Sequence, residues 1–268
     1  ILSRFIAGRI NSIIIRIRKY IEFFYDYLQF KKFIKNQKID KEVEVVDDEK
    51  ICITVIPWLG SAVPWYSVTI ALMLYKKGKS ICILFDDMPF GDDKLYHRLQ
   101  SKLIFNILIK LPFKLIKLSD YQSLKLSSSE VDRFAKLNSL HAMHGENNLL
   151  ARQSYEIIIK EQLSLIYSKI ASLYEKEKFT QIFLPGGIWG SSCIFPLFAK
   201  NNDTQIITYD AGDGRLVLSV FGVAAQLKDI PYSFNKILKN PKEKKFAIQK
   251  GLTQIEKRRT GKSGRHYI

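Results

Sequence analysis

The segment from Gln181 to Gly214, QIFLPGGIWGSSCIFPLFAKNNDTQIITYDAGDG, constrains the fold of this chain most strongly. Its pattern predicts a buried strand (181–184), a glycine turn (185–187), a helix (191–200), and a second strand (205–209) that ends in an acidic turn (210–214). Strand, helix and strand in this order form a βαβ unit, whose ligands collect outside the carboxyl ends of the strands. Both glycine-bearing turns are therefore expected at one edge of a sheet.

The first of these turns has the features of a binding site. Gly186 and Gly187 allow the backbone to approach a ligand closely. Ser191 and Ser192 are expected at the start of the following helix, where free N–H groups favour an anion or a sugar oxygen. The alternative is a tight turn followed by ordinary capping serines.

An earlier segment repeats the pattern. A near-continuous apolar run (51–56), a helix (66–77) and a second apolar run (80–85) predict another βαβ unit with strands buried on both faces. The loop after its first strand contains Trp58, Gly60, Ser61 and Trp65, and tryptophan faces are good platforms for sugar rings. Core packing is the alternative for each tryptophan.

The adjacent acids Asp86 and Asp87 resemble the paired acids of metal-dependent sugar transfer, but neighbouring strand residues point to opposite faces, which favours a role in the loop.

The positive charge is concentrated at the two ends of the chain. The 268 residues carry a formal net charge of +16, to which residues 1–40 contribute +6 and residues 239–268 contribute +8. Basic ends on a near-neutral body indicate contact with an anionic surface or with another domain, rather than a nucleic-acid groove. We therefore expect no nucleic-acid partner.

The three cysteines lie in or beside apolar runs and lack the spacing of a metal site: Cys52, Cys82 and Cys193. This is the pattern of core cysteines in a reducing compartment.

The N-terminal segment predicts a basic amphipathic helix. Apolar residues recur at steps of three and four: Ile6, Ile10, Ile13, Ile17, Ile21, Phe24 and Leu28. Arginines interrupt this series, so a membrane-spanning helix, which needs roughly 20 mainly apolar residues, is not expected. The helix either lies in the interface of an anionic membrane or packs its apolar stripe on its own domain. The predicted organisation is this helical segment (1–40), an α/β domain (41–240) and a basic C-terminal helix or linker (241–268).

Histidines and a carboxylate meet in the middle of the chain, between a predicted strand (111–118) and a long predicted helix (149–176). His141, His144 and Glu146 lie in LHAMHGENNLL. Gly145 favours a loop here, so we expect no metal site. His144 or Glu146 could instead act as a general base or bind substrate by a hydrogen bond.

Together, these segments resemble a known family. LPGGIWGSS, ITYDAGDGRLVLSVFGVAAQLKDIP and PWLGSAVPWYSVTIALMLYKKGKSICILFDD are similar to the N-terminal domain of bacterial capsule and surface-polysaccharide glycosyltransferases of the two-domain GT-B type. The resemblance covers roughly residues 50–265. It implies a Rossmann-like parallel sheet with helices on both faces, which holds the acceptor glycan or lipid-linked glycan. The nucleotide-sugar would bind a second domain beyond this chain, so this chain alone is expected to be inactive.

The resemblance also implies roles for particular residues. A carboxylate or histidine must take the proton of the attacking acceptor hydroxyl. Asp210 and Asp213 are the first candidates, followed by His144 and Glu146. Trp58, Ser61, Trp65, Trp189, Ser191 and Ser192 would shape acceptor binding. No metal and no cofactor beyond the donor sugar are expected, and the protein would be cytoplasmic, at the inner face of the membrane. The alternative is a noncatalytic membrane-surface module that holds a nucleotide or glycan.

Overall fold

The computed structural model describes residues 2–37, 50–58, 61–91, 94–124, 128–144, 148–212, 215–220, 222–226 and 229–260. It confirms the predicted α/β fold. A six-stranded sheet has the order β3-β2-β1-β4-β5-β6, in which the first five strands are parallel and β6 is antiparallel to β5. The strands are β1 (Lys50–Val55), β2 (Ser80–Phe85), β3 (Lys114–Lys117), β4 (Gln181–Pro185), β5 (Gln205–Gly212) and β6 (Arg215–Ser219).

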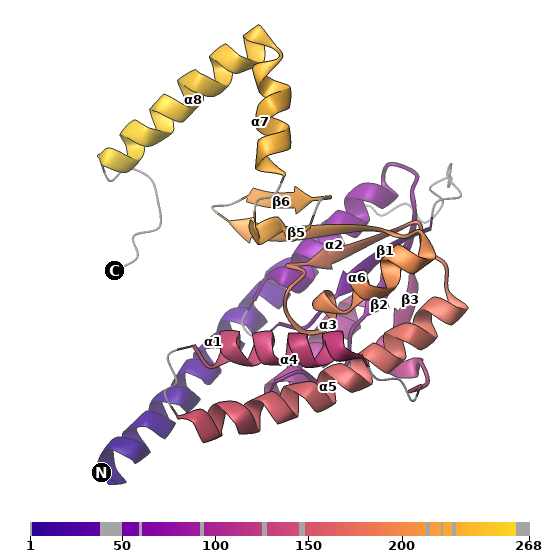
Figure 1. Ribbon diagram of the computed structural model, residues 1–268, viewed down its shortest axis with the longest axis vertical. Helices are drawn as coiled ribbons and strands as arrows, with labels where there is room; N and C mark the ends of the chain where they lie inside the picture. Colours follow the sequence, from indigo (N-terminus) through magenta and orange to yellow (C-terminus); the bar gives the residue numbers. More distant parts are fainter. Residues whose placement is uncertain are drawn as a thin grey trace.

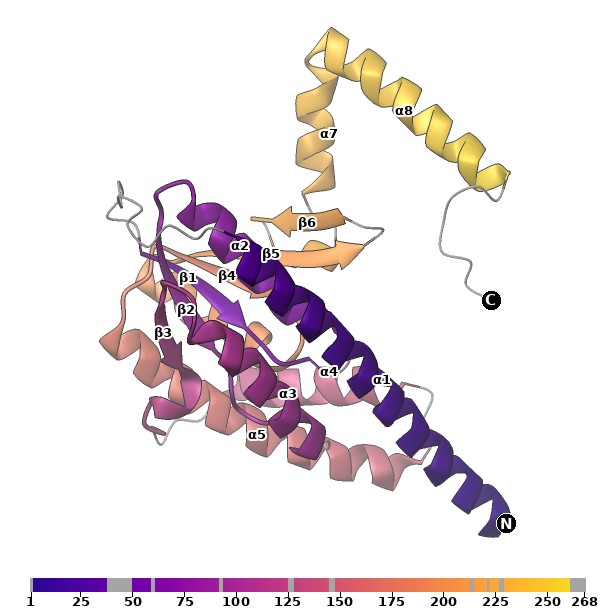
Figure 2. The ribbon, with the colours of Figure 1, turned by 180° about the vertical axis from the view of Figure 1, so that it is seen from behind.

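Helices cover both faces of this sheet (Figures 1 and 2). The longer helices are α1 (Leu2–Asn36), α2 (Val63–Tyr75), α3 (Lys94–Leu108), α4 (Ser129–Ala142), α5 (Leu149–Lys176), α7 (Ile230–Leu238) and α8 (Pro241–Arg259). Helices α1, α2 and α3 pack on one face, and α4, α5 and the short α6 (Phe195–Ala199) pack on the other. The sequence pattern predicted most of these elements, but not α3.

Alternation along the strands explains the two layers. In β1, Ile51, Ile53 and Val55 enter the core beneath α1, α2 and α3, whereas Cys52 enters the core beneath α4 and α5. Each strand is thus buried on both faces, as expected for a parallel sheet. At the opposite edge from the carboxyl ends, Glu177 forms ion pairs with Lys50 of β1 and with Lys114 of β3 (2.7 Å).

Helix α1 packs into the same core as the sheet. Trp65 of α2 is only 4% exposed, and its ring stacks on Phe23 (5.4 Å between centroids) and Phe30 (5.0 Å) of α1. The N-terminal helix is therefore anchored to the α/β body by aromatic stacking. No described helix is long and apolar enough to cross a membrane.

Two C-terminal helices project from the sheet edge formed by β6 (Figure 1). Helices α7 and α8 contact each other, and none of their described side chains is buried. Asn240 caps α8 by accepting hydrogen bonds from the backbone of Lys242 and Glu243. This arm contains much of the basic charge found at the end of the sequence.

Candidate functional site

The strand order creates a crevice between β1 and β4. The chain leaves β1 toward β2 on one side and leaves β4 toward β5 on the other. Connections that diverge in this way open a crevice at the carboxyl ends of the two strands, which is where open α/β sheets bind ligands. The polar loops that follow β1, β2 and β4 all lie at this crevice.

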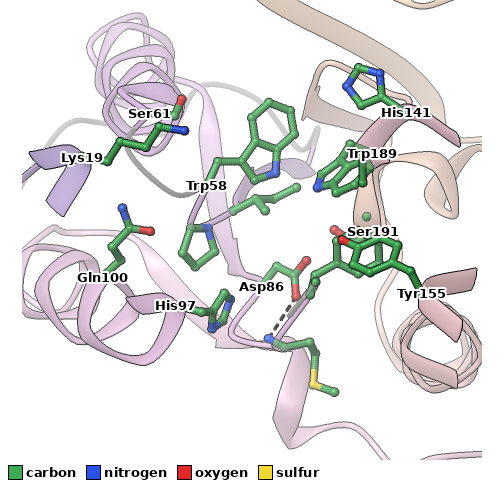
Figure 3. Close-up of a pocket in the computed structure, with 17 residues that line it drawn as sticks. Lys19, Trp58, Ser61, Asp86, His97, Gln100, His141, Tyr155, Trp189 and Ser191 are labelled. Atoms are coloured by element: carbon green, nitrogen blue, oxygen red, sulfur yellow. Dashed lines mark hydrogen bonds between the residues drawn. The ribbon is translucent and has the colours of Figure 1, made fainter. Parts of the chain in front are cut away.

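A cavity of about 570 Å³ occupies this position (Figure 3). Its lining comes from the loops after β1, β2 and β4 and from α1, α3, α4 and α5: Lys19, Ile56, Pro57, Trp58, Ser61, Asp86, Met88, Phe90, Gly91, His97, Gln100, His141, Ala142, Tyr155, Trp189, Gly190 and Ser191. Pockets of this size bind small organic ligands, with apolar walls and a few placed polar groups.

Asp86 is the buried acid of the cavity. It directly follows β2 and is only 4% exposed. Its carboxylate accepts a hydrogen bond from the Met88 N–H (3.2 Å) and lies against the Ser191 hydroxyl. Burial raises the pKa of Asp86 to about 6, although Ser191 and Met88 oppose that rise. Asp86 is therefore a carboxylate at neutral pH, and it is a stronger base than an exposed aspartate.

The neighbouring acid has a structural role. Asp87 accepts two hydrogen bonds from Ser119, one from its N–H (2.9 Å) and one from its hydroxyl (2.6 Å). The two carboxylates thus serve different loops, as the alternation of residues after a strand requires. The expectation of a loop role was therefore correct for Asp87, but Asp86 lines the cavity.

Aromatic side chains form the walls of the cavity. Trp189 packs edge-on against Phe90 (5.1 Å between centroids) and against His141 (5.6 Å). The Trp58 ring lies over Gly186, where an added Cβ would come within 3.1 Å of the indole. These contacts hold both indoles beside the cavity, where their apolar faces are available to a flat ligand surface.

Two further polar side chains come from α3. Gln100 is fully buried, and both of its amide atoms lack a hydrogen-bond partner among the described residues. An unpartnered buried amide costs free energy unless a ligand or water satisfies it. Burial lowers the pKa of His97, against the opposing charge of Asp87, so its imidazole is neutral at pH 7. Gln100 and His97 thus offer donors and acceptors to an uncharged polar ligand.

The glycine turn after β4 shapes the site from behind. Gly186 and Gly187 have positive φ angles of 66° and 91°. A Cβ on Gly187 would lie 2.9 Å from Cγ2 of Thr208, so this position excludes a side chain. The Thr208 hydroxyl in turn donates to Gly222 O (2.6 Å) and accepts from the Ala224 N–H (2.8 Å). The turn therefore joins β4 to the loop after β6.

The helix expected at residues 191–200 is shorter and begins later. Residues Gly190–Cys193 form a 3₁₀ turn, and α6 covers only Phe195–Ala199. Ser191 and Ser192 are therefore buried within the 3₁₀ turn and do not lie at the N-terminus of a long helix. Pro196 at the second position of α6 is consistent with this later start.

The structure brings some of the predicted site residues together and separates others. Trp58, Ser61, Trp189 and Ser191 line the cavity. Trp65, Gly186, Gly187, Ser192, His144 and Asp210 do not line it: Trp65 packs on α1, and His144 is exposed after α4. Gly60, Glu146 and Asp213 lie outside the described residues.

Other cavity residues were absent from the predicted set. They are mainly Asp86, His97, Gln100 and Tyr155. Asp86 could have been found from its place at the end of a buried strand, whereas His97 and Gln100 lie on the unpredicted helix α3. Among the described residues, no three His, Cys, Asp or Glu side chains are grouped closely enough to hold a metal ion.

Comparisons with known proteins found no relative. No protein-family model matches the chain, and neither a curated protein nor a solved structure matches it.

Proposed function

We propose that this cavity binds the sugar acceptor of a glycosyltransferase and that the chain is the acceptor-binding part of that enzyme. The observation that carries the proposal is the buried carboxylate of Asp86 between the aromatic walls of Trp58 and Trp189. The early resemblance to the N-terminal domain of GT-B polysaccharide glycosyltransferases points the same way.

The lining suits a saccharide for three reasons. A sugar ring has apolar C–H faces that stack on indoles, and its hydroxyls need both donors and acceptors. Gln100 supplies a donor and an acceptor that are otherwise unused, and Asp86 supplies a charged acceptor. Among the described lining residues, only Lys19 carries a full positive charge. A mostly neutral, hydroxyl-bearing ligand therefore fits better than a polyanion.

Asp86 is our candidate general base. As the acceptor oxygen attacks the anomeric carbon of the donor, a carbon–oxygen bond forms and the hydroxyl proton passes to Asp86. The bond from the anomeric carbon to the nucleotide diphosphate breaks, and the diphosphate leaves with the electron pair. The Met88 N–H holds the carboxylate, the Ser191 hydroxyl lies beside it, and its pKa of about 6 keeps it ionised at neutral pH. Asp210, at the end of β5, is the second candidate.

The donor belongs to the proposal as a substrate that binds elsewhere. Among the described lining residues, Lys19 is the sole cation, so they contain no cluster of positive charges suited to a diphosphate. We therefore expect the chain to bind acceptor saccharides but not nucleotide-sugars, which would bind a second domain. A cytoplasmic position at the membrane face is part of the same proposal.

Titration and transfer assays test this function. Neutral oligosaccharides titrated into the chain should give saturable heat, and nucleotide-sugars should give none. In the product of the whole gene, Asp86→Asn should lower transfer from a nucleotide-sugar by about 100-fold or more, within the usual range for a general base. The matched control Asp87→Asn should keep transfer within about threefold of wild type.

The outcomes separate the candidate functions. If Asp86→Asn retains wild-type transfer while Asp210→Asn abolishes it, Asp210 is the base. Saccharide binding without transfer under any donor would favour the noncatalytic glycan-binding module. Absence of saccharide binding would overturn both assignments.

A further inference from the structure

Helix α1 exposes a second apolar face beyond the one that anchors it. Ile14, Ile17, Ile21, Phe24, Tyr25 and Leu28 are between 41% and 62% exposed. Successive helical residues are 100° apart, so these positions fall within about 100° of one another and form one row. The row follows the apolar series seen in the sequence. It measures about 21 Å from residue 14 to residue 28 at 1.5 Å per residue.

The exposed row is separate from the packed face of the helix. Phe23 and Tyr27 are buried, and Phe30 stacks on Trp65. These residues complete the contact between α1 and the body. The exposed row therefore has no partner on another element among the described residues, although it presents an apolar area that a monomer in water would normally hide.

A lysine-rich groove continues the row at the C-terminal end of α1. The groove lies between α1 and α3, which run side by side in Figure 2, and has a volume of about 490 Å³. Its floor is apolar, and four lysines surround it: Lys31, Lys32 and Lys35 of α1 and Lys110 in the turn after α3. No Asp or Glu is among its described lining residues. Glu22, on α1, is already paired with Arg18 (2.9 Å).

We infer that the exposed row and the lysine groove dock this protein onto an anionic phospholipid bilayer. The row would lie in the boundary between head groups and acyl chains, and the lysines would meet the lipid phosphates. An apolar face beside a set of cations is the arrangement of interfacial helices. Each lysine near an anionic membrane surface contributes about 1 kcal/mol to the binding free energy, which corresponds to about a fivefold increase in affinity.

Charge favours a bilayer over a second copy of the chain. A parallel symmetric dimer through this face would bring the same lysines of both copies together, and an antiparallel one would bring them near the basic segment 16–19 of the other copy's α1, so like charges would repel in either case. An anionic membrane surface complements both the lysines and the apolar row. The inference rests on the surface of α1 and of the groove beside it, and it does not depend on the saccharide-binding and transfer steps of the proposed function.

Docking in this way would place the cavity close to the membrane. Lys19 of α1 lines the cavity, as Figure 3 shows. A helix with its side chains is about 10 Å across, so the cavity would lie within roughly one helix diameter of the lipid surface.

Vesicle sedimentation at 0.1 M NaCl tests the inference. The chain should bind vesicles of phosphatidylcholine with 30% phosphatidylglycerol, an arbitrary test composition of about one anionic lipid in three, and bind pure phosphatidylcholine far more weakly. Lys32→Gln/Lys35→Gln should weaken binding to the anionic vesicles by roughly 25-fold. The matched control Lys136→Gln/Lys200→Gln removes two exposed lysines from the other face of the sheet and should stay within about threefold of wild type.

A second set of variants, with a matched control, tests the apolar row. Ile17→Gln/Ile21→Gln/Phe24→Gln should lower the partition coefficient by roughly 100-fold because three side chains lose their insertion. The control Leu149→Gln/Leu150→Gln/Ile157→Gln changes three exposed residues of α5. Deleting α1 would be a poor test, because it would uncover Trp65. Circular dichroism of each variant shows whether it folds.

Several results would overturn the inference. Equal binding to neutral and anionic vesicles, equal losses in the control variants, or no vesicle binding would each do so. Sedimentation velocity that shows a dimer, abolished by the row variant, would assign the face to a second copy. Saccharide titration of the row variant in solution should be unchanged, so a failure of docking is distinguishable from a failure of the proposed function.

Discussion

Replacing Asp86 by asparagine should make the protein more stable at pH 8 while removing the candidate base. The carboxylate is buried, and its pKa of about 6 lies above the ordinary value of 3.8. The folded state therefore binds more protons than the unfolded state between these values, and folding stability falls as the pH rises through that window. The loss is complete about one pH unit above the folded-state pKa, near pH 7.

The magnitude follows from the pKa shift. A shift of about two pH units corresponds to about 3 kcal/mol, at 1.36 kcal/mol per unit. The asparagine of the Asp86→Asn variant would carry no charge, and its side-chain oxygen could still accept the Met88 N–H. The stability gap between Asp86→Asn and wild type should therefore widen by about 2–3 kcal/mol from pH 4 to pH 8. At pH 8 the melting temperature should rise by roughly 5–10 °C.

Urea unfolding at several pH values measures this gap. The stabilities of wild type and Asp86→Asn should converge near pH 4, separate progressively up to about pH 7, and then stay parallel. The control Asp87→Asn should lose about 1 kcal/mol, because an amide nitrogen cannot accept the hydrogen bonds that Ser119 donates to both carboxylate oxygens. A gap for Asp86→Asn that stays constant with pH would refute the account of a buried, ionised carboxylate.

Three further substitutions test the surrounding structure by urea unfolding. Gly187→Ala should cost about 2 kcal/mol or more, because φ is 91° and the new Cβ would meet Thr208 at 2.9 Å; a neutral result would remove the turn from our account. Tyr209→Phe should cost about 1 kcal/mol, since it removes a buried hydrogen bond to Ser67. Burial opposes ionisation of Glu177, but its lysine partners outweigh burial and lower its pKa, so Glu177→Gln should cost about 1 kcal/mol at pH 7. That cost should disappear as the pH falls below the ordinary value of 4.5, and a pH-independent cost would contradict the ion pairs.

The sequence predicted the sheet well because its strands are buried on both faces. Continuous apolar runs at 51–56 and 80–85 lie within a residue or two of β1 and β2. A glycine turn next to such a run places the loop at the carboxyl end, so the position of the site could also be predicted.

The composition of the site depended on long-range packing that local patterns do not encode. Trp58 and Trp65 occur in the same loop pattern, but only the stacking of Trp65 on α1 separates a core tryptophan from a cavity tryptophan. His141 and His144 are one helical turn apart, and α4 ends so that His141 alone reaches Trp189. Gln100 could be recognised only once α3 was placed beside the sheet.

The N-terminal helix packs on its own domain, but through a different set of residues from the predicted apolar stripe, and the membrane-interface alternative stays a prediction. The apolar series of the sequence, which includes Ile17, Ile21 and Phe24, forms the exposed row. A different set, centred on Phe23, packs on Trp65. The amphipathic pattern of the sequence therefore identified the exposed face of the helix. The aromatic residues of the buried face lie between the residues of that pattern, so the pattern did not identify them.

The most direct test of the central claim is a glycan-array measurement with the labelled chain and its Trp189→Ala variant at pH 7.5. The account predicts that the wild type binds at least one family of neutral glycans. Removing the indole should weaken that binding by about 10-fold or more, because the aromatic contact contributes roughly 1.5 kcal/mol or more to the binding free energy. A wild-type chain that binds no glycan, or a Trp189→Ala variant that binds as well as wild type, would contradict the assignment of this cavity to a saccharide.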